Sequence, residues 1–409
     1  IFVQPVILQN AGMDFGAVMT ATCIAGALGT FLMAFLANYP IALAPAMGHN
    51  LFFAFVICGA MGFTWQQALG ANFISGCLFI LLAAFKFRER IIEAVPDSLK
   101  NAIAAGIGLL IALVGLGYGG LVVKSPGFLL EMGNLRSGAA LLTLFGVGLI
   151  AVLLVLRVQG AILWGILICA LIGVPVGLVQ KPDSIISSPP SLMPTLFKMD
   201  VMGALNKNLI AVIFVLFFLD LFDTVGTLIG VAERGGMMKD GTLPRAGRAL
   251  LSDAIATVAG TCLGTSTVTS YVESAAGVAE GGRTGLANVV TGILFLLALF
   301  FSPLVRIVGG GYMPEGASMA LYPAIAPALI IVGSFMIGCV GRVNWDDYSE
   351  AIPAFLTVIV MGVTMNITEG IAFGFISYVT LKTVRGEGCK VHPLTYIFAV
   401  LFLVRYMFL

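Results

Sequence analysis

Two acidic residues interrupt a long apolar stretch of this chain. Asp220 and Asp223 lie in the run FVLFFLDLFDTVGTL, residues 214–228, with no basic residue beside them. The surrounding apolar segment, 209–232, is long enough for a helix to cross a bilayer core of ~30 Å. Spaced three apart, the two carboxylates share one helix face near the membrane midplane, and Thr227 continues that face. Since an acid there costs at least ~2.5–3.5 kcal/mol, the pair predicts a site for a ligand or a proton.

A second candidate region is the segment NYPIALAPAMGHNLFFAF, residues 38–55. Its two prolines remove backbone donors and restrict the chain, and Gly48 loosens it further. Asn50 can cap a helix that begins at Leu51. The segment therefore predicts a short extended piece followed by a half-helix.

A third region, GTSTVTSYVESAAGVAEG, residues 264–281, has the same character. Its first part is a β-favouring Ser/Thr/Val run, and Ser270 and Glu273 have the spacing of a capping box at a helix start. The two interrupted segments lie roughly 220 residues apart. Interrupted segments at corresponding positions of two halves are typical of transporter binding sites, where half-helix N-termini point at the ligand.

Each of these residues also has a purely structural interpretation. Asn50 and Glu273 could serve only as helix caps, and the aspartate pair could serve only helix packing. His49 adjoins the first break and is interpreted as a packing or tuning residue beside the site. Asp253 and Glu369 are interpreted as capping or interface groups, and Asn72 and Asn366 as helix-packing residues.

Composition defines the class of protein. The mean hydropathy is +1.07, and only 10% of residues are charged, against ~25% in soluble domains. A polytopic, all-α membrane protein is therefore expected. A net charge of +1 without a basic cluster argues against nucleic acid as a partner. The seven cysteines lack metal-binding or redox spacing, so we expect buried thiols, no metal and no cofactor other than a proton.

The apolar segments predict seven spans in each half, joined by a polar connection at 180–207. Strict alternation, with the first helix leaving the cytoplasm, places 15 of the 21 basic residues on the cytoplasmic side. Because each half has an odd number of spans, the two halves have opposite orientations in the membrane and form inverted repeats. The chain begins at Ile1 without signal-peptide features, so the first helix is expected to lack its start, and 393–409 to lie at the interface. The expected spans are 1–11, 14–37, 41–58, 64–86, 97–123, 137–157, 160–179, 209–232, 246–263, 267–280, 284–308, 316–340, 351–366 and 368–384.

Several long strings closely resemble the bacterial AzgA-type purine permeases, relatives of the nucleobase–ascorbate transporters. The resemblance covers essentially the whole chain and rests on PIALAPAMGHNLFFAF, TWQQALGANFISG, FLDLFDTVGTLIGVA, DGTLPRAGRALLSDA and LGTSTVTSYVESAAGVAEGGRTGL.

The resemblance implies a UraA-like fold of 14 spans in a 7+7 inverted repeat, with extended segments in spans 3 and 10. A core domain would comprise 1–90 and 208–310, and a gate domain 91–207 and 311–409. It implies a multi-pass protein of the bacterial inner membrane that is not an enzyme, and leaves a homodimer open. It also implies proton-coupled uptake of hypoxanthine, guanine, adenine or xanthine.

The family's binding positions match Gly48, Asn50, Asp220, Asp223 and Glu273. Carboxylates suit the N–H edges of a purine, so we expect Glu273 and Asp220 to bind an edge and Asn50 to orient the ring. Asp223, with Glu273, is expected to carry the coupling proton, since three carboxylates in one dry cavity cannot all ionise cheaply. The positions beside the site are His49, where relatives commonly carry an apolar residue, Thr227 and Ser270. Apolar walls could come from Phe52, Phe217 and Phe218, for which packing is the alternative.

Three competing functions are weaker. An anion carrier on the same scaffold would require a basic residue in the interrupted segments, which are acidic or neutral. An intramembrane aspartyl protease would want aspartates on two facing helices, whereas Asp220 and Asp223 share one. A channel would want repeated polar residues along a pore, whereas long apolar helices dominate here.

Overall fold

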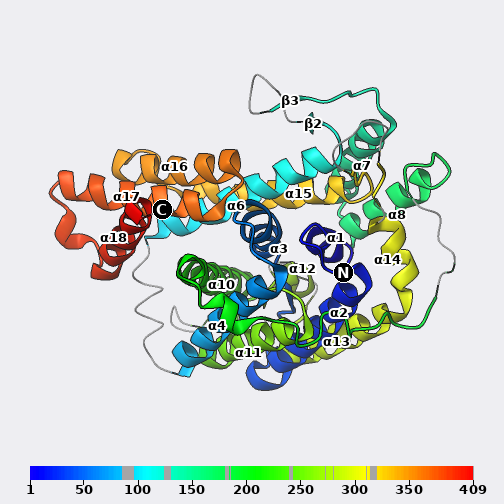
Figure 1. Ribbon diagram of the computed structural model, residues 1–409, viewed down its shortest axis with the longest axis horizontal. Coiled ribbons are helices and arrows are strands. Elements are labelled where there is room, and N and C mark those ends of the chain that lie inside the picture. Colours follow the sequence, from blue (N-terminus) through cyan, green and yellow to red (C-terminus); the bar gives the residue numbers. More distant parts are fainter. Residues whose placement is uncertain are drawn as a thin grey trace. The chain divides into compact units, whose positions relative to one another are not determined.

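The computed structural model describes residues 1–84, 96–123, 130–179, 184, 186–238, 243–271, 273–279, 281–309, 311–313 and 320–408 (Figure 1). The chain forms two compact units, each built from two segments that are far apart in sequence. Unit 1 contains Val3–Ala94 and Ser187–Ser302, and unit 2 contains Val95–Ile186 and Pro303–Leu409. The connection 187–207 thus belongs to unit 1 by its contacts. The division into a core and a gate domain stays a prediction.

Unit 1 consists of helices around two very short strands. Two of its helices continue as π-helices, α2 as η1 and α3 as η2. Its elements are α1 (Val3–Gln9), α2 (Phe15–Leu32), η1 (Met33–Ala37), β1 (Leu43–Pro45), α3 (Met47–Leu51), η2 (Phe52–Ala60), α4 (Trp65–Ala84), α9 (Val201–Ala204), α10 (Lys207–Arg234), α11 (Ala246–Leu263), β4 (Val268–Ser270), α12 (Ser274–Ala279), α13 (Gly285–Ala298) and η3 (Leu299–Phe301).

Unit 2 is also mostly helical, with a two-stranded hairpin of β2 and β3. Its central helices α6 and α15 approach closely at Gly108 and Gly333, where a Cβ on either residue would lie under 3.0 Å from the partner's backbone. Its elements are α6 (Asp97–Tyr118), β2 (Val122–Val123), β3 (Glu131–Met132), α7 (Gly138–Val155), α8 (Ala161–Gly173), α14 (Ser302–Gly309, whose first residue belongs to unit 1), α15 (Ala326–Ile337), η4 (Gly338–Arg342), α16 (Tyr348–Thr364), α17 (Ile367–Val384), η5 (Gly388–Lys390) and α18 (Pro393–Phe408).

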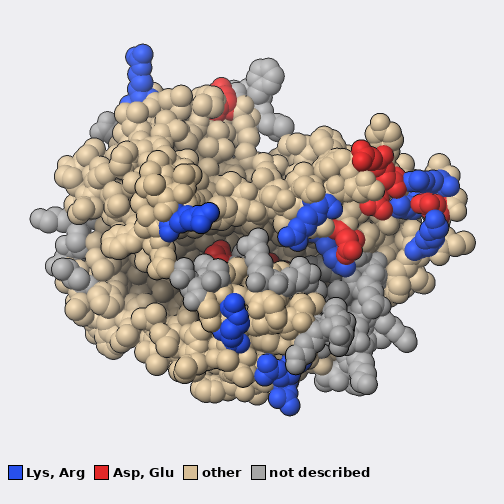
Figure 2. Space-filling view, turned by 180° about the vertical axis from the view of Figure 1, so that it is seen from behind, with Lys and Arg blue, Asp and Glu red and all other residues tan. Residues whose placement is uncertain are grey.

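The described residues include six helices that are long and apolar enough to cross a membrane. Shorter apolar helices accompany them, among them Tyr348–Thr364 and Pro393–Val404. Lys, Arg, Asp and Glu are sparse on the face that Figure 2 presents. A mostly helical membrane protein is therefore confirmed, whereas the count of 14 spans in two inverted repeats stays a prediction. The six ranges are Phe15–Ala37, Trp65–Ala83, Asp97–Tyr118, Gly138–Val155, Val212–Ala232 and Gly285–Gly309.

Both interrupted segments contain the expected strand followed by a helix, and the two strands pair with each other. β1 and β4 are antiparallel, with Leu43 opposite Ser270 and Pro45 opposite Val268. The Thr30 hydroxyl donates to the carbonyl of Leu43 and accepts from its N–H, both at 3.0 Å. These contacts satisfy backbone groups that would otherwise be unpaired in a buried, non-helical segment.

Two details of the predicted helix starts are wrong. Helix α3 begins at Met47, so Asn50 lies inside the helix and does not cap one at Leu51. The pairing with the second segment continues to the residue before α3, where the N–H of Ala46 bonds the carbonyl of Thr267. Helix α12 begins at Ser274, which leaves Ser270 in β4 and outside a capping box.

Helix α18 packs along α17. The ring of Phe375 in α17 contacts Phe398 and Phe402 of α18, with centroids 5.7 and 6.2 Å apart. The Tyr406 hydroxyl donates to the carboxylate of Glu369 near the start of α17. The expected interfacial position of 393–409 stays a prediction.

Candidate functional site

The two aspartates of α10 differ in exposure and in hydrogen bonding. Asp220 is fully buried, and the Thr257 hydroxyl lies 3.4 Å from its Oδ2, but the single proton of that hydroxyl is shared with the carbonyl of Val268 at 2.8 Å. Its Oδ1 is buried without a hydrogen-bond partner among the described residues. Asp223, one turn further, is half-buried, and its Oδ2 accepts from Thr269 at 3.2 Å. Asp220 therefore keeps one free acceptor in a dry environment, while Asp223 faces the more open side.

Asp253 is a third buried carboxylate at this site, and its interpretation as a capping or interface group is wrong. It is the eighth residue of α11 and is fully buried. Its Oδ2 accepts from Thr224 of α10 at 2.8 Å, and its Oδ1 accepts from Ser270 of β4 at 3.1 Å. An aspartate of a second helix is thus tied to the helix of the aspartate pair. One feature of the sequence could have indicated this role of Asp253. Thr257 lies one turn further along, on the same face of an apolar helix.

The hydroxyls that flank and form β4 connect four helices. Ser266 donates to the side-chain oxygen of Asn50 in α3, and Thr267 donates to that of Asn72 in α4 at 3.3 Å. Thr269 and Ser270 donate to the carboxylates in α10 and α11 described above. These bonds fix the orientation of four acceptors around one short strand. Asn72, interpreted from the sequence as a packing residue, belongs to this network.

The first break contributes an amide and an imidazole. Asn50 is buried, and its Nδ2 has no hydrogen-bond partner among the described residues. His49 is 3% exposed, and its Nε2 likewise lacks a partner there. Gly48 is half-buried in the same helix. From α1, Gln4 donates to the hydroxyls of Thr265 and Ser266 at 3.0 and 3.2 Å, a contact that the sequence did not reveal.

Glu273 stands at the open side of this region. It is exposed and directly precedes α12, whose first residue, Ser274, accepts a hydrogen bond from the N–H of Ala42 at 3.0 Å. Nearby, the Tyr271 hydroxyl donates to the carbonyl of Pro45 at 2.5 Å. The residues on both sides of Glu273 are thus hydrogen-bonded to the first interrupted segment, 38–55.

The structure joins some of the predicted site residues by hydrogen bonds and places others beside them. Asn50, Asp220, Asp223 and Ser270 belong to the bonded network. The others lie on the same elements: Gly48 and His49 in α3, Thr227 buried in α10, and Glu273 before α12. Together they offer carboxylate acceptors, one free amide donor and hydroxyls, which suit a neutral polar ligand with N–H groups. In the described part of the chain, no three His, Cys, Asp or Glu side chains are grouped to hold a metal ion.

Known proteins resemble this chain over nearly its whole length. It is 46% identical to the guanine/hypoxanthine permease PbuG of Bacillus subtilis, covering 100% of this chain and 93% of that protein. It is 43% identical to the adenine permease AdeP of Escherichia coli, covering 100% and 89%.

Among solved structures, the transmembrane domain of the cyanobacterial bicarbonate transporter BicA has a similar fold. The TM-score is 0.65 at 14% identity, with 90% of this chain and 93% of that domain covered. At that identity the likeness shows the fold of a membrane transporter alone. The sequence model described as "Permease family" (Xan_ur_permease) matches residues 1–373. The chain therefore belongs to this permease family, and it is a membrane transport protein and not an enzyme.

Proposed function

We propose that the chain takes up purine nucleobases together with protons. The observation that carries the proposal is a pair of buried atoms without partners among the described residues, the acceptor Asp220 Oδ1 and the donor Asn50 Nδ2. Buried polar groups in folded proteins are nearly always hydrogen-bonded, so an acceptor and a donor of this kind on the contacting helices α10 and α3 are candidates to bind a ligand. The relatives named guanine/hypoxanthine and adenine permeases indicate which ligand class to test.

A purine presents ring and exocyclic N–H donors beside nitrogen and carbonyl acceptors on a flat ring. In our proposal, Asp220 and Glu273 accept from its N–H groups, and the Asn50 amide donates to a ring nitrogen or carbonyl. Ser266 supports this role because its hydroxyl occupies the oxygen of Asn50 and leaves the nitrogen free. Glu273, being exposed, is the group that an arriving ligand meets first.

Asp223 is proposed to carry the coupling proton. Three carboxylates, Asp220, Asp223 and Asp253, lie close together, and the hydrogen bonds described for them come from hydroxyls and not from cations. Several uncompensated charges at membrane depth are costly, so a proton or ligand donors must offset them. Asp223 is half-buried and can exchange a proton more readily than the fully buried Asp220 and Asp253.

The proposed architecture is the UraA-like one: 14 spans in two inverted repeats, with unit 1 as the mobile core and unit 2 as the gate. It is supported by the two compact units, each drawn from both halves of the chain, and by the pairing of β1 with β4. The proposed location is the bacterial inner membrane. The fold likeness to a bicarbonate transporter does not favour an anion here, because the described network is acidic.

Uptake of labelled hypoxanthine into proteoliposomes tests this function. With an inward proton gradient we expect accumulation that a protonophore abolishes, because transport of a neutral purine with a proton is driven by the proton gradient and the potential. Empty liposomes give the background. Uptake that reaches the same level with and without the protonophore would contradict proton coupling, and no uptake of any purine would contradict the substrate class.

A further inference from the structure

Gln4 of α1 carries a further buried polar atom without a partner, in the same unit as those of Asp220 and Asn50. The Gln4 side chain is 4% exposed, and its Oε1 has no hydrogen-bond partner among the described residues. Helix α1 contacts α3, which carries Asn50. The proposed roles of Asp220, Asn50 and Glu273 in purine binding leave this acceptor unused.

The hydrogen bonds of the Gln4 amide define which of its atoms is free. Its Nε2 donates to the hydroxyls of Thr265 at 3.0 Å and Ser266 at 3.2 Å, so both of its N–H groups are used. The Ser266 hydroxyl has one proton and donates it to the side-chain oxygen of Asn50. Toward Gln4 this hydroxyl can therefore only accept, which requires the amide nitrogen on that side. The free atom of Gln4 is thus the acceptor Oε1.

The free atoms of Gln4 and Asn50 belong to two amides that bond to the same hydroxyl. Gln4 bonds to Ser266 through its nitrogen and Asn50 bonds to it through its oxygen. The acceptor Oε1 of Gln4 and the donor Nδ2 of Asn50 are left over. Such a pair is complementary to a ligand edge on which an N–H group stands beside a nitrogen or carbonyl acceptor. Purines carry edges of this kind.

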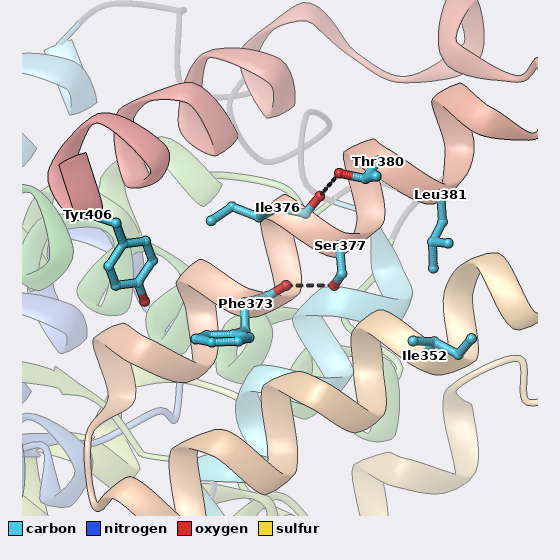
Figure 3. Close-up of a pocket in the computed structure, with 7 residues that line it drawn as sticks. All are labelled: Ile352, Phe373, Ile376, Ser377, Thr380, Leu381 and Tyr406. Atoms are coloured by element: carbon cyan, nitrogen blue, oxygen red, sulfur yellow. Dashed lines mark hydrogen bonds between the residues drawn. The ribbon is translucent and has the colours of Figure 1, made fainter.

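The apolar pocket of unit 2, between α16, α17 and α18, has no comparable pair (Figure 3). Ser377 and Thr380 donate to carbonyls of their own helix at 2.5 and 2.7 Å, as the dashed lines of Figure 3 show. The Tyr406 hydroxyl donates to the carboxylate of Glu369. Since each hydroxyl of the lining is already bonded, a purine in this pocket would leave its own polar groups unpaired.

With Gln4 included, the proposed site has more acceptors than hypoxanthine has N–H groups. Asp220 and Glu273 are proposed to accept from N–H groups, and Gln4 adds a third acceptor. Hypoxanthine carries one N–H on each of its rings, so one of the three acceptors would stay unpaired. Guanine and adenine each carry an exocyclic amino group, which supplies a further donor. Because an unpaired buried acceptor costs free energy, binding should favour a purine with an amino group.

We propose that Gln4 determines a preference for aminopurines, because its Oε1 accepts a hydrogen bond from the exocyclic amino group of guanine or adenine. The Asn50 amide donates to the ring nitrogen beside that amino group. This inference rests on the proposed purine site and names a selectivity within it.

The test compares each aminopurine with the base that lacks only the amino group. Guanine is paired with hypoxanthine, and adenine with unsubstituted purine. Competition against labelled hypoxanthine on the purified protein gives the affinity of each base. In the wild type we expect the amino group to strengthen binding about fivefold in at least one pair, the effect of one neutral hydrogen bond. This ratio of affinities within a pair is the amino-group gain.

In Gln4→Met, which has a side chain of similar length without an amide, the amino-group gain should disappear. Affinity for the base without the amino group should change less than about twofold. Gln4→Glu cannot replace both N–H donors but keeps an acceptor oxygen in either protonation state, so it should retain the gain. The opposite behaviour of these two variants separates binding of the amino group from support of Thr265 and Ser266.

Two further variants serve as controls. Gln9→Met changes an exposed glutamine at the end of the same helix and should keep wild-type affinities. Thr265→Val removes one hydrogen bond of the Gln4 nitrogen and leaves Oε1 in place. Any loss of affinity in Thr265→Val should be equal for both members of a pair, as expected for a structural contact.

An amino-group gain that survives Gln4→Met would overturn the proposal, as would a wild type without the gain in both pairs. Equal loss of all four bases in Gln4→Met, with the gain also lost in Gln4→Glu, would make Gln4 a structural residue and would also overturn it. Failure of every purine to bind the wild type would overturn the proposed function together with this inference. Binding without selectivity would overturn this inference alone.

Discussion

Replacing Asp223 with asparagine is expected to abolish accumulation of purine while leaving exchange of internal for external purine intact. One charge moving through 100 mV gains ~2.3 kcal/mol, which supports a gradient of roughly 50-fold. Asparagine can still accept the hydroxyl of Thr269 through its amide oxygen, so the local structure is retained. It cannot take up a proton, so transport should equilibrate the purine without concentrating it.

Net uptake and counterflow of labelled hypoxanthine in the same proteoliposomes measure the two activities. Asp97→Asn, an exposed carboxylate of α6 paired with Lys100, is the matched control and should behave as wild type. Full accumulation in Asp223→Asn would contradict its role as proton carrier. Loss of exchange together with accumulation would instead place Asp223 in purine binding.

Replacing Asp253 with leucine is expected to destabilise unit 1 by about 2–6 kcal/mol. The substitution leaves two buried hydroxyls, those of Thr224 and Ser270, without their acceptor, and each unpaired buried group costs about 1–3 kcal/mol. Adding Thr224→Val and Ser270→Ala removes the two hydroxyls that have lost their acceptor. The triple variant should therefore recover much of the lost stability.

Denaturant titration in detergent, followed by circular dichroism, compares the single and triple variants. Thr364→Val, an exposed hydroxyl of α16 bonded to its own helix, is the control for loss of a hydroxyl. An Asp253→Leu variant as stable as wild type would show that the carboxylate is not needed to hold β4 against α10 and α11. A triple variant less stable than the single one would contradict the hydrogen-bond account.

The elements that could be predicted from the sequence are those whose structure depends on residues within the element itself. Hydropathy defines α10 around Asp220 and Asp223, because an apolar run of that length forms a helix in a membrane. Pro40 and Pro45 disfavour a helix in the first interrupted segment, and the Ser/Thr/Val run before Glu273 favours a strand in the second. Both strands were therefore expected near their observed positions.

The partners of buried side chains could not be predicted in the same way. Asp253, Asn72 and Gln4 each stand in a helix whose pattern shows a polar residue but not what it contacts. Their hydrogen bonds reach β4 or the hydroxyls just before it, and they depend on how helices far apart in sequence pack. The misplaced starts of α3 and α12 have the same origin, since the N–H of Ala46 pairs with Thr267 and the N–H of Tyr271 pairs with Ala42, each more than two hundred residues away.

The most direct test of the proposed site is binding of labelled hypoxanthine and adenine to the purified protein between pH 5 and pH 8. The account predicts saturable binding that depends on pH, weakened roughly 5- to 10-fold by Glu273→Gln and by Asp220→Asn, the effect of replacing a charged hydrogen-bond acceptor with a neutral one. Tight binding in both variants that ignores pH would contradict it and would place the purine away from these carboxylates.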